Sequence, residues 1–327
     1  PPPPPHTHTL YSSSAASDVY KRQDLGSEHL LAYEAGVTTA LGNGELQVVG
    51  FRHDLTDAIR RVTFADGRRQ RVNADELESA GVEPGDLDLL ICATYTPDMA
   101  FPSTACLIQD RIGARPAAAF DLQAACSGFV YALITASQFV EAGGARRVLV
   151  VGADVNSTIV NPEDRKVTAL FGDGAGAVVV GKVNSGSGIL GHHLGADGGG
   201  GDLFFKPAGG SRKPASHETV QAGEHFIRMD GRNLFRFGVQ AMVESSEKAM
   251  AAAGCTAGDI DLFIPHQANL RIIRAGLARM EIPEERTLIT LGEYANTASA
   301  TIPIGLDQAV RQDRIQPGMN VLLTGFG

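Results

Sequence analysis

Three side chains that could do nucleophilic or proton-transfer chemistry stand at ends of strand-like runs. Cys126 lies in "DLQAACSGFV", between a strand-like and a helix-like segment. At the start of a helix, the dipole and the unpaired N–H groups stabilise a thiolate, so we predict a lowered pKa for this thiol. The same N–H groups could form half of an oxyanion hole. From its position alone, Cys126 is equally well explained as a nucleophile or as a small buried residue without a chemical role.

His266 and Asn296 occupy similar places further along the chain. His266 directly follows the apolar run "DLFIP", and Asn296 lies in "LGEYANTASA", before a helix-like run. A lone histidine is often structural, and an asparagine before threonine is often a helix cap. Together with Cys126, however, these residues stand at equivalent strand–helix junctions, a pattern that predicts one shared site with a cysteine nucleophile.

The elements that must position these residues alternate between helix and strand. The runs "PSTACLIQDRIGA" and "SGFVYALITASQFVEAGG" predict helices that end at glycines, and "LDLLICAT", "AAAFDLQ" and "RRVLVVGAD" predict buried strands. Such alternation is typical of parallel strands covered by helices on both faces. A similar order recurs up to "NVLLTGF", which indicates an α/β fold of two related halves.

The expected organisation has four parts. Residues 1–23 lack apolar periodicity, and Ser13 to Gln23 resemble the translation of a sequencing-library adaptor, so a disordered or adaptor-derived tail is expected. Residues 24–75 remain unassigned, although "RVTFADGRRQRV" predicts a β-hairpin. Residues 76–195 are expected to form the half with the nucleophile, and residues 196–327 the half with His266 and Asn296, truncated at its end.

Composition excludes several classes of protein. A net charge of −9 and the absence of tryptophan argue against a general nucleic-acid binder. The four cysteines are widely spaced without a CxxC pair, so neither a disulfide framework nor a zinc site is predicted. No apolar run is long enough to cross a bilayer and no secretory leader is visible, so we expect a cytoplasmic protein with no membrane partner.

Four motifs together resemble the β-ketoacyl-acyl-carrier-protein synthase III family of thiolase-like condensing enzymes. They are "AFDLQAACSGFVYAL", "FGDGAGAVVV", "PHQANLRII" and "ANTASATIP", and the resemblance covers about residues 78 to 327. It implies a five-layered α-β-α-β-α fold of two similar halves, usually a homodimer. It also implies that Cys126, His266 and Asn296 form the catalytic triad.

The activity implied by the resemblance is a decarboxylating Claisen condensation. An acyl-CoA, acetyl-CoA or another short-chain one, would acylate Cys126, and malonyl-acyl-carrier-protein would then condense with the acyl group to start fatty-acid biosynthesis. No metal or redox cofactor is implied. The glycines of "FGDGAGAVVV" lead into a strand rather than a helix, which favours close packing over a nucleotide-binding loop.

The resemblance also assigns binding residues outside the triad. Asn269 matches a position that contacts pantetheine, Arg165 matches an arginine at the CoA adenine, and Phe101 matches a residue inserted into the partner's acyl pocket. The residues matched to carrier-protein docking are Arg271, Arg236 and Arg279. A solvated basic helix face is the alternative explanation for these arginines.

Two departures from the family keep other hypotheses open. The first 75 or so residues do not match, and the family pattern continues past "FG" into a glycine-rich strand that supplies an oxyanion-hole N–H. The sequence therefore leaves room for an inactive fragment incomplete at both ends. A type III-like synthase of a polyketide or long-chain pathway would use the same triad.

Overall fold

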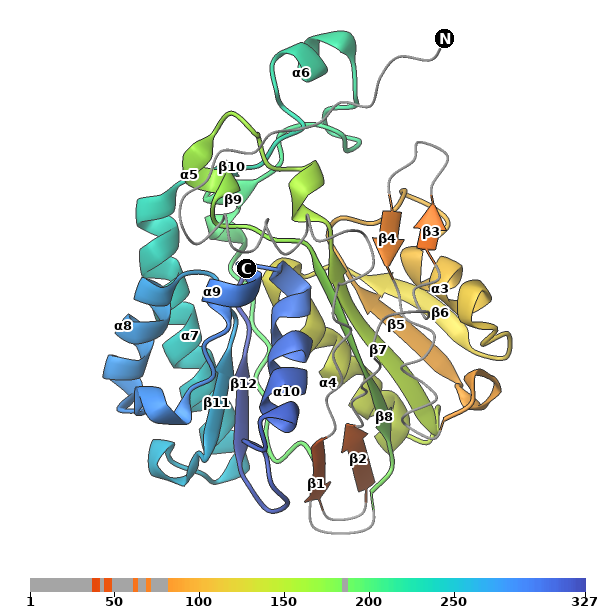
Figure 1. Ribbon diagram of the computed structural model, residues 1–327, viewed down its shortest axis with the longest axis vertical. Helices are drawn as coiled ribbons and strands as arrows, with labels where there is room; N and C mark the ends of the chain where they lie inside the picture. The colour runs from red at the N-terminus through yellow and green to blue at the C-terminus, as the bar shows by residue number, and fades with distance from the viewer. Residues whose placement is uncertain (1–36, 42–43, 49–60, 64–68, 72–81, 184–187) are drawn as a thin grey trace.

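Two β-sheets on either side of a pair of central helices form the frame of the protein (Figure 1). The computed structural model describes residues 82–183 and 188–327, together with the strand residues 37–41, 44–48, 61–63 and 69–71. The expected tail over residues 1–23 lies outside the described residues, as does most of the unassigned segment 24–75.

The first sheet has the strand order β6-β5-β7-β8. Its strands are β5 (Leu89–Ala93), β6 (Ala118–Leu122), β7 (Arg147–Asp154) and β8 (Gly174–Gly181). The first three are parallel, as predicted, and β8 runs antiparallel to β7. The apolar run of β5 is buried throughout, whereas β6 is only half-buried. The prediction of a buried strand was wrong for β6, because an edge strand has a neighbour on one side only.

Helices cover both faces of this sheet. The helix α3 (Thr104–Ile112) packs on β5 and β6, and α4 (Gly128–Glu141) packs on β5, β7 and β8. The predicted glycine stops are confirmed: Gly113 and Gly143 have φ values of 76° and 75°, in the left-handed region that favours glycine.

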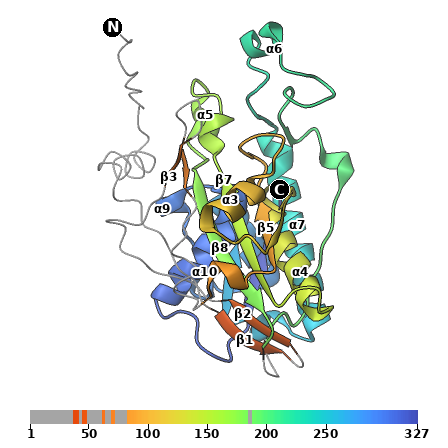
Figure 2. The same ribbon diagram turned by 90° about the vertical axis from the view of Figure 1, so that its right-hand side faces the viewer.

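The second half contains a smaller sheet of two strands, β11 (Leu262–Pro265) and β12 (Val321–Thr324), which pair in parallel. The helix α10 (Thr301–Arg311) contacts β11, β8 and α4, while α7 (Gly231–Ala253) contacts β12 and packs against α8 (Leu270–Met280). The layers therefore run α3, first sheet, α4 with α10, second sheet, α7 with α8 (Figures 1 and 2). This order confirms the predicted five-layered thiolase-like fold.

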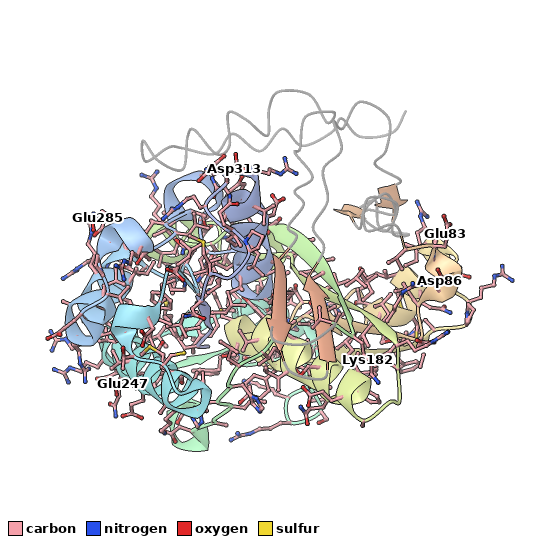
Figure 3. All side chains as sticks on the ribbon, turned by 90° about the horizontal axis from the view of Figure 1, so that it is seen from below. Glu83, Asp86, Lys182, Glu247, Glu285 and Asp313 are labelled. Atoms are coloured by element: carbon pink, nitrogen blue, oxygen red, sulfur yellow. The ribbon has the colours of Figure 1, made fainter. Side chains whose placement is uncertain are left out.

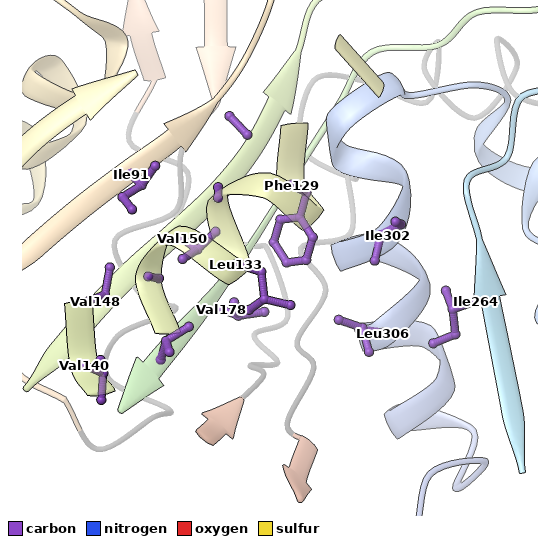
Figure 4. Packing of buried hydrophobic residues seen from close by; sticks show 14 of the residues in the cluster. Ile91, Phe129, Leu133, Val140, Val148, Val150, Val178, Ile264, Ile302 and Leu306 are labelled. Atoms are coloured by element: carbon purple, nitrogen blue, oxygen red, sulfur yellow. The ribbon is translucent and has the colours of Figure 1, made fainter. Parts of the chain in front are cut away.

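One apolar core crosses the central layers. Phe129 of α4 lies beside Ile302 and Leu306 of α10, and Ile264 of β11 continues the same cluster (Figure 4). Charged side chains such as Glu83, Glu247 and Glu285 lie at the rim (Figure 3). Because the central helices are covered by sheets on both sides, their first turns are held firmly, and these turns follow Cys126 and Asn296.

Shorter elements complete the described chain. They are the hairpin strands β1 (Val37–Leu41) and β2 (Gly44–Val48), β3 (Arg61–Thr63) and β4 (Arg69–Arg71), the short pair β9 (Phe204–Phe205) and β10 (Arg228–Met229), and the helices α5 (Arg165–Thr168), α6 (His217–Gln221) and α9 (Leu291–Tyr294). The antiparallel pairing of β3 with β4 confirms the hairpin predicted for this sequence. In the part of the chain that the structure describes, no helix is long and apolar enough to cross a membrane.

Candidate active site

A pocket of about 640 Å³ is lined by Cys126, His266 and Asn296, which come from three separate strand–helix junctions. The structure thus brings together the three residues that the sequence analysis selected. Asn269 and the two arginines Arg236 and Arg271 line the same pocket.

Cys126 lies in a single 3₁₀ turn between β6 and α4. The preceding Ala125 has a φ of 44°, a left-handed conformation that costs free energy in a residue with a Cβ. Burial raises the pKa of the Cys126 thiol, and the negative charge of Asp154 raises it further. The expected lowering of this pKa was wrong for the free protein, because removal of the thiol from water outweighs the backbone hydrogen bond that favours the thiolate.

His266 directly follows β11 and is fully enclosed. Its backbone N–H donates to the carbonyl oxygen of Thr324 in β12 over 2.8 Å, and its ring lies edge-on to Phe326 with 5.3 Å between ring centroids. Burial lowers the pKa of His266 to about 3, because the cationic imidazolium loses its hydration. The ring is therefore neutral at pH 7 and can accept a proton. Within the described residues, its Nδ1 has no hydrogen-bond partner.

Asn296 is held by its backbone and by one end of its side chain. Its N–H donates to Leu170 O over 2.9 Å, and its carbonyl accepts from Gly172 N over 2.9 Å. The side-chain Oδ1 accepts from Ala298 N over 2.9 Å, as in a helix cap. This bond fixes the amide plane and leaves Nδ2 as the group able to donate into the pocket.

The glycine-rich run that begins β8 packs directly on the Asn296 segment. A Cβ at Gly172 would lie 2.5 Å from Tyr294 O, and one at Gly174 would lie 2.9 Å from Thr297 Cγ2. These contacts leave no room for a side chain. The interpretation of this motif as close packing is confirmed, and the motif leads into a strand as predicted.

The GFG segment at residues 325–327 belongs to this site, although the sequence alone did not indicate it. A Cβ at Gly327 would lie 2.6 Å from Cys126 N, and one at Gly325 would lie 3.2 Å from Cys126 O. Gly327 also lines the pocket, and Figure 1 shows it in the middle of the molecule. The sequence signal that could have predicted this contact with Cys126 is the pair of glycines on either side of Phe326, directly after the strand β12.

The basic residues near the pocket differ in their surroundings. Arg271 is exposed and lies over the ring of Phe235, 5.9 Å from its centroid. Asn269 is the N-cap of α8, because its Oδ1 accepts from Arg271 N over 2.8 Å. Arg274 on the same helix forms an ion pair with Glu284, in which its Nε and one terminal nitrogen each donate to a carboxylate oxygen over 2.9 Å.

Three predicted binding residues do not line this pocket. Arg279 is exposed near the other end of α8, and Arg165 is exposed at the start of α5. Phe101 precedes α3 and is 84% exposed, far more than is usual for an aromatic ring.

A second cavity, of about 1080 Å³, reaches the other side of the nucleophile turn. Ala125 and Ser127 line it next to Cys126, and Phe204, Phe326 and Gly327 line both cavities. Its walls include the apolar side chains of Ile159, Phe204 and Ile227. Within the described residues, no three histidine, cysteine, aspartate or glutamate side chains form a group that could hold a metal ion.

Comparisons with known proteins agree with this arrangement. Family profiles for 3-oxoacyl-[acyl-carrier-protein] synthase III match residues 120–198, and for its C-terminal domain residues 250–327. The β-ketoacyl-[acyl-carrier-protein] synthase III of Caldanaerobacter subterraneus is 51% identical over 251 residues, which are 77% of this chain and 76% of that protein.

Solved structures show the same fold. The 3-oxoacyl-(acyl carrier protein) synthase III of Pseudomonas aeruginosa matches with a TM-score of 0.70 and 38% identity, over 77% of this chain and 76% of that one. The priming β-ketosynthase of the R1128 polyketide pathway matches with a TM-score of 0.69 and 36% identity, over 77% and 75%. The chain therefore belongs to the 3-oxoacyl-[acyl-carrier-protein] synthase III family of thiolase-like condensing enzymes.

Proposed function

We propose that this chain condenses an acyl-CoA, acetyl-CoA or another short-chain one, with malonyl-acyl-carrier-protein and so initiates fatty-acid biosynthesis. The observation that carries the proposal is the single pocket lined by Cys126, His266 and Asn296. The curated relatives that are 50% and 51% identical to this chain over 254 and 251 aligned residues are named β-ketoacyl-[acyl-carrier-protein] synthase III, which supports the same reaction.

In the first step, the Cys126 sulfur attacks the thioester carbonyl of the acyl-CoA. The thiol is protonated at rest, so its proton must leave during the attack. His266 lies in the same pocket and would pass this proton on to the departing sulfur, although burial makes its ring a weaker base than an exposed histidine. The new C–S bond forms as the bond to the CoA sulfur breaks, and the proton leaves with CoA as its thiol. The backbone N–H of Cys126 would stabilise the oxyanion of the tetrahedral intermediate, since the N–H groups of Ser127 and Gly128 already donate to Ala124 O and Ala125 O.

In the second step, the malonyl thioester loses CO2 and the electron pair of the broken C–C bond forms an enolate. Asn296 Nδ2 and the His266 ring donate hydrogen bonds to the enolate oxygen, which stabilise the charge as it develops. The enolate carbon then attacks the acyl group, the thiolate of Cys126 leaves, and it takes up one proton from solvent to restore the resting thiol. The electrons balance without a metal or redox cofactor, so we propose that none is needed.

The two cavities suit the two parts of the substrates. The pocket lined by Asn269, Arg236 and Arg271 would take the pantetheine arm, with the arginines attracting an acidic carrier protein. The part of the second cavity lined by Ile159, Phe204 and Ile227 would hold the acyl chain, while Lys206, Glu244 and Lys248 make another part of its lining charged. Arg165 and Arg279 are exposed and would act outside the pocket, at the CoA adenine and on the carrier protein.

We also propose that the protein is a cytoplasmic homodimer. Among the described strands, β6 has a partner on one side only, and its side chains are half-buried. Phe101, which is near β6 in sequence, is exposed. An exposed edge strand and an exposed aromatic ring both favour association with a second copy. A cytoplasmic location follows from the acyl-CoA substrate.

Incubation with radiolabelled acetyl-CoA tests the proposal. We expect acid-stable label on Cys126 and, after addition of malonyl-acyl-carrier-protein, labelled acetoacetyl-carrier-protein. A folded protein that takes no label would contradict the proposal. The similarity to the R1128 priming ketosynthase favours one alternative, a synthase that primes a secondary pathway, and a clear preference for longer starter acyl groups would support it.

A further inference from the structure

Two polar residues at the end of β7 are buried but do not line the 640 Å³ pocket. Asp154 is 1% exposed and Asn156 is fully buried. They stand in "VGADVN", at a strand end beside the strand ends that carry the site, and the triad does not include them. Buried polar groups need hydrogen-bond partners, so the partners indicate what they hold in place.

Asp154 connects the first half of the molecule to the turn after Asn296. Its Oδ2 accepts from Ser299 N over 3.0 Å and from Ser299 Oγ over 2.5 Å. Its Oδ1 accepts from Tyr95 N over 2.9 Å and from Thr96 Oγ1 over 3.0 Å, just beyond β5. Ser299 Oγ also lies 2.9 Å from Ala93 O, at the end of β5.

Asn156 reaches the other side of the same turn. Its Nδ2 donates to Gly172 O over 2.6 Å and to Asn296 O over 3.3 Å. Its Oδ1 accepts from the hydroxyl of Tyr95. The Asn296 turn is therefore held on both sides by side chains from the end of β7.

This support matters because the turn is costly to form. Ala295 and Ala298, on either side of Asn296, have φ values of 58° and 51°, in the left-handed region. Such conformations persist only when the surrounding structure holds them. Ala298 N also donates to Asn296 Oδ1, so a relaxed turn would rotate the amide that points into the pocket.

From these contacts we infer that Asp154 and Asn156 are positioning residues for condensation, which fix the direction of the Asn296 amide without touching substrate. The inference rests on the proposed role of Asn296 in that step. A carboxylate is the suitable anchor, since it accepts several hydrogen bonds at once and the bonds to a charged group are strong. Misplacement of a catalytic group by about 1 Å costs about 100-fold in rate.

The test compares two rates in the same protein samples: acylation of Cys126 by acetyl-CoA, and condensation of the preformed acetyl-enzyme with malonyl-acyl-carrier-protein. The variants are Ser299→Ala and Asn156→Ala, which leave the charge of Asp154 in place because that charge also raises the pKa of Cys126. The matched control is Ser137→Ala, which removes another buried hydroxyl that bonds only within α4. We expect condensation to fall about 10- to 100-fold in the variants while acylation changes less than about threefold. The control should leave the ratio of the two rates unchanged.

The ratio of the condensation rate to the acylation rate distinguishes a positioning role from simple loss of structure. Unfolding lowers both rates by the same factor and so leaves this ratio unchanged. Asn296→Ala is measured alongside, alone and combined with Ser299→Ala. If the inference holds, Ser299→Ala lowers the ratio no further in the Asn296→Ala background. If Asn296→Ala lowers the ratio but the Asn156 and Ser299 variants leave it unchanged, the inference is overturned and the proposed function stands. If Asn296→Ala itself leaves the ratio unchanged, the proposed role of Asn296 fails, and the inference fails with it.

Discussion

The Cys126 turn and the Asn296 turn are built alike and held differently. Each leads into a central helix, α4 or α10, and each contains at least one alanine with a positive φ, Ala125 in the first turn and Ala295 and Ala298 in the second. The Asn296 backbone donates a hydrogen bond to Leu170 O and accepts hydrogen bonds from Gly172 N and Asn156 Nδ2. The Cys126 turn is instead covered by the backbone of Gly325 and Gly327. A nucleophile must remain accessible to a carbonyl carbon, whereas a hydrogen-bond donor acts only when its direction is fixed.

The largest expected effect comes from removing the nucleophile. Cys126→Ala should lower acyl transfer from acetyl-CoA by at least about 10³-fold, since among the described residues that line the pocket Cys126 is the only thiol. Transfer is measured as acid-stable label on the protein, with thermal unfolding as the check on folding. Label retained on another residue would show that the Cys126 turn is not the acyl-carrying one.

The next effect distinguishes the two turns directly. Asn296→Ala should leave acylation of Cys126 nearly unchanged and lower condensation about 100- to 1000-fold, because one donor to the enolate oxygen is lost. Single-turnover measurements of each step provide the data. Equal losses in both steps would mean that the two turns do not divide the chemistry as proposed.

The buried His266, which lines the same pocket as Cys126 and Asn296, predicts that the stability of the protein depends on pH. The pKa of His266 is about 3 when folded, below its ordinary value of 6.5. As the pH falls, His266 is therefore protonated in the unfolded chain before it is protonated in the folded protein. This lowers the free energy of unfolding, so the stability present above pH 6.5 is lost as the pH falls towards 3. Between pH 7 and pH 5 this loss should be about 2 kcal/mol.

His266→Gln removes the titrating group and serves as the comparison. Its unfolding free energy, measured by denaturant titration, should fall less than that of the unchanged protein over the same pH interval. Parallel curves for the two proteins would show that His266 is not held neutral by burial.

A smaller effect tests the packing behind the Asn296 turn. A Cβ at Gly172 would lie 2.5 Å from Tyr294 O, so Gly172→Ala should destabilise the protein by about 1–3 kcal/mol and slow condensation more than acylation. Gly292→Ala is the matched control, because no atom lies within 4 Å of its added Cβ. Equal stability of the two variants would show that the close contact can relax.

The smallest effect lies outside both turns. Arg271→Glu should raise the KM for malonyl-acyl-carrier-protein by about fivefold, equivalent to about 1 kcal/mol, and leave acylation by acetyl-CoA unchanged. Arg279→Glu, on the same helix but away from the pocket lining, should have a weaker effect. The docking proposal fails if carrier-protein kinetics are the same in both variants and in the unchanged protein.

The sequence by itself determined the α/β alternation, the glycine helix ends and the three polar residues at strand ends. These are local properties: apolar runs, turn residues and the position of a side chain relative to a strand can be read without knowing what lies beside them. The resemblance of the four motifs then assigned the family, which the comparisons confirmed.

Only the tertiary structure decided the environment of each residue. Burial reversed the predicted pKa shift of Cys126, the position of β6 at the sheet edge left it half-buried, and distant glycines at 325 and 327 closed over the nucleophile. Asp154 and Asn156 likewise reach Ser299 and Asn296 across about 140 residues of chain. Solvation and hydrogen bonding depend on neighbours that are remote in sequence, and only the folded chain brings those neighbours together.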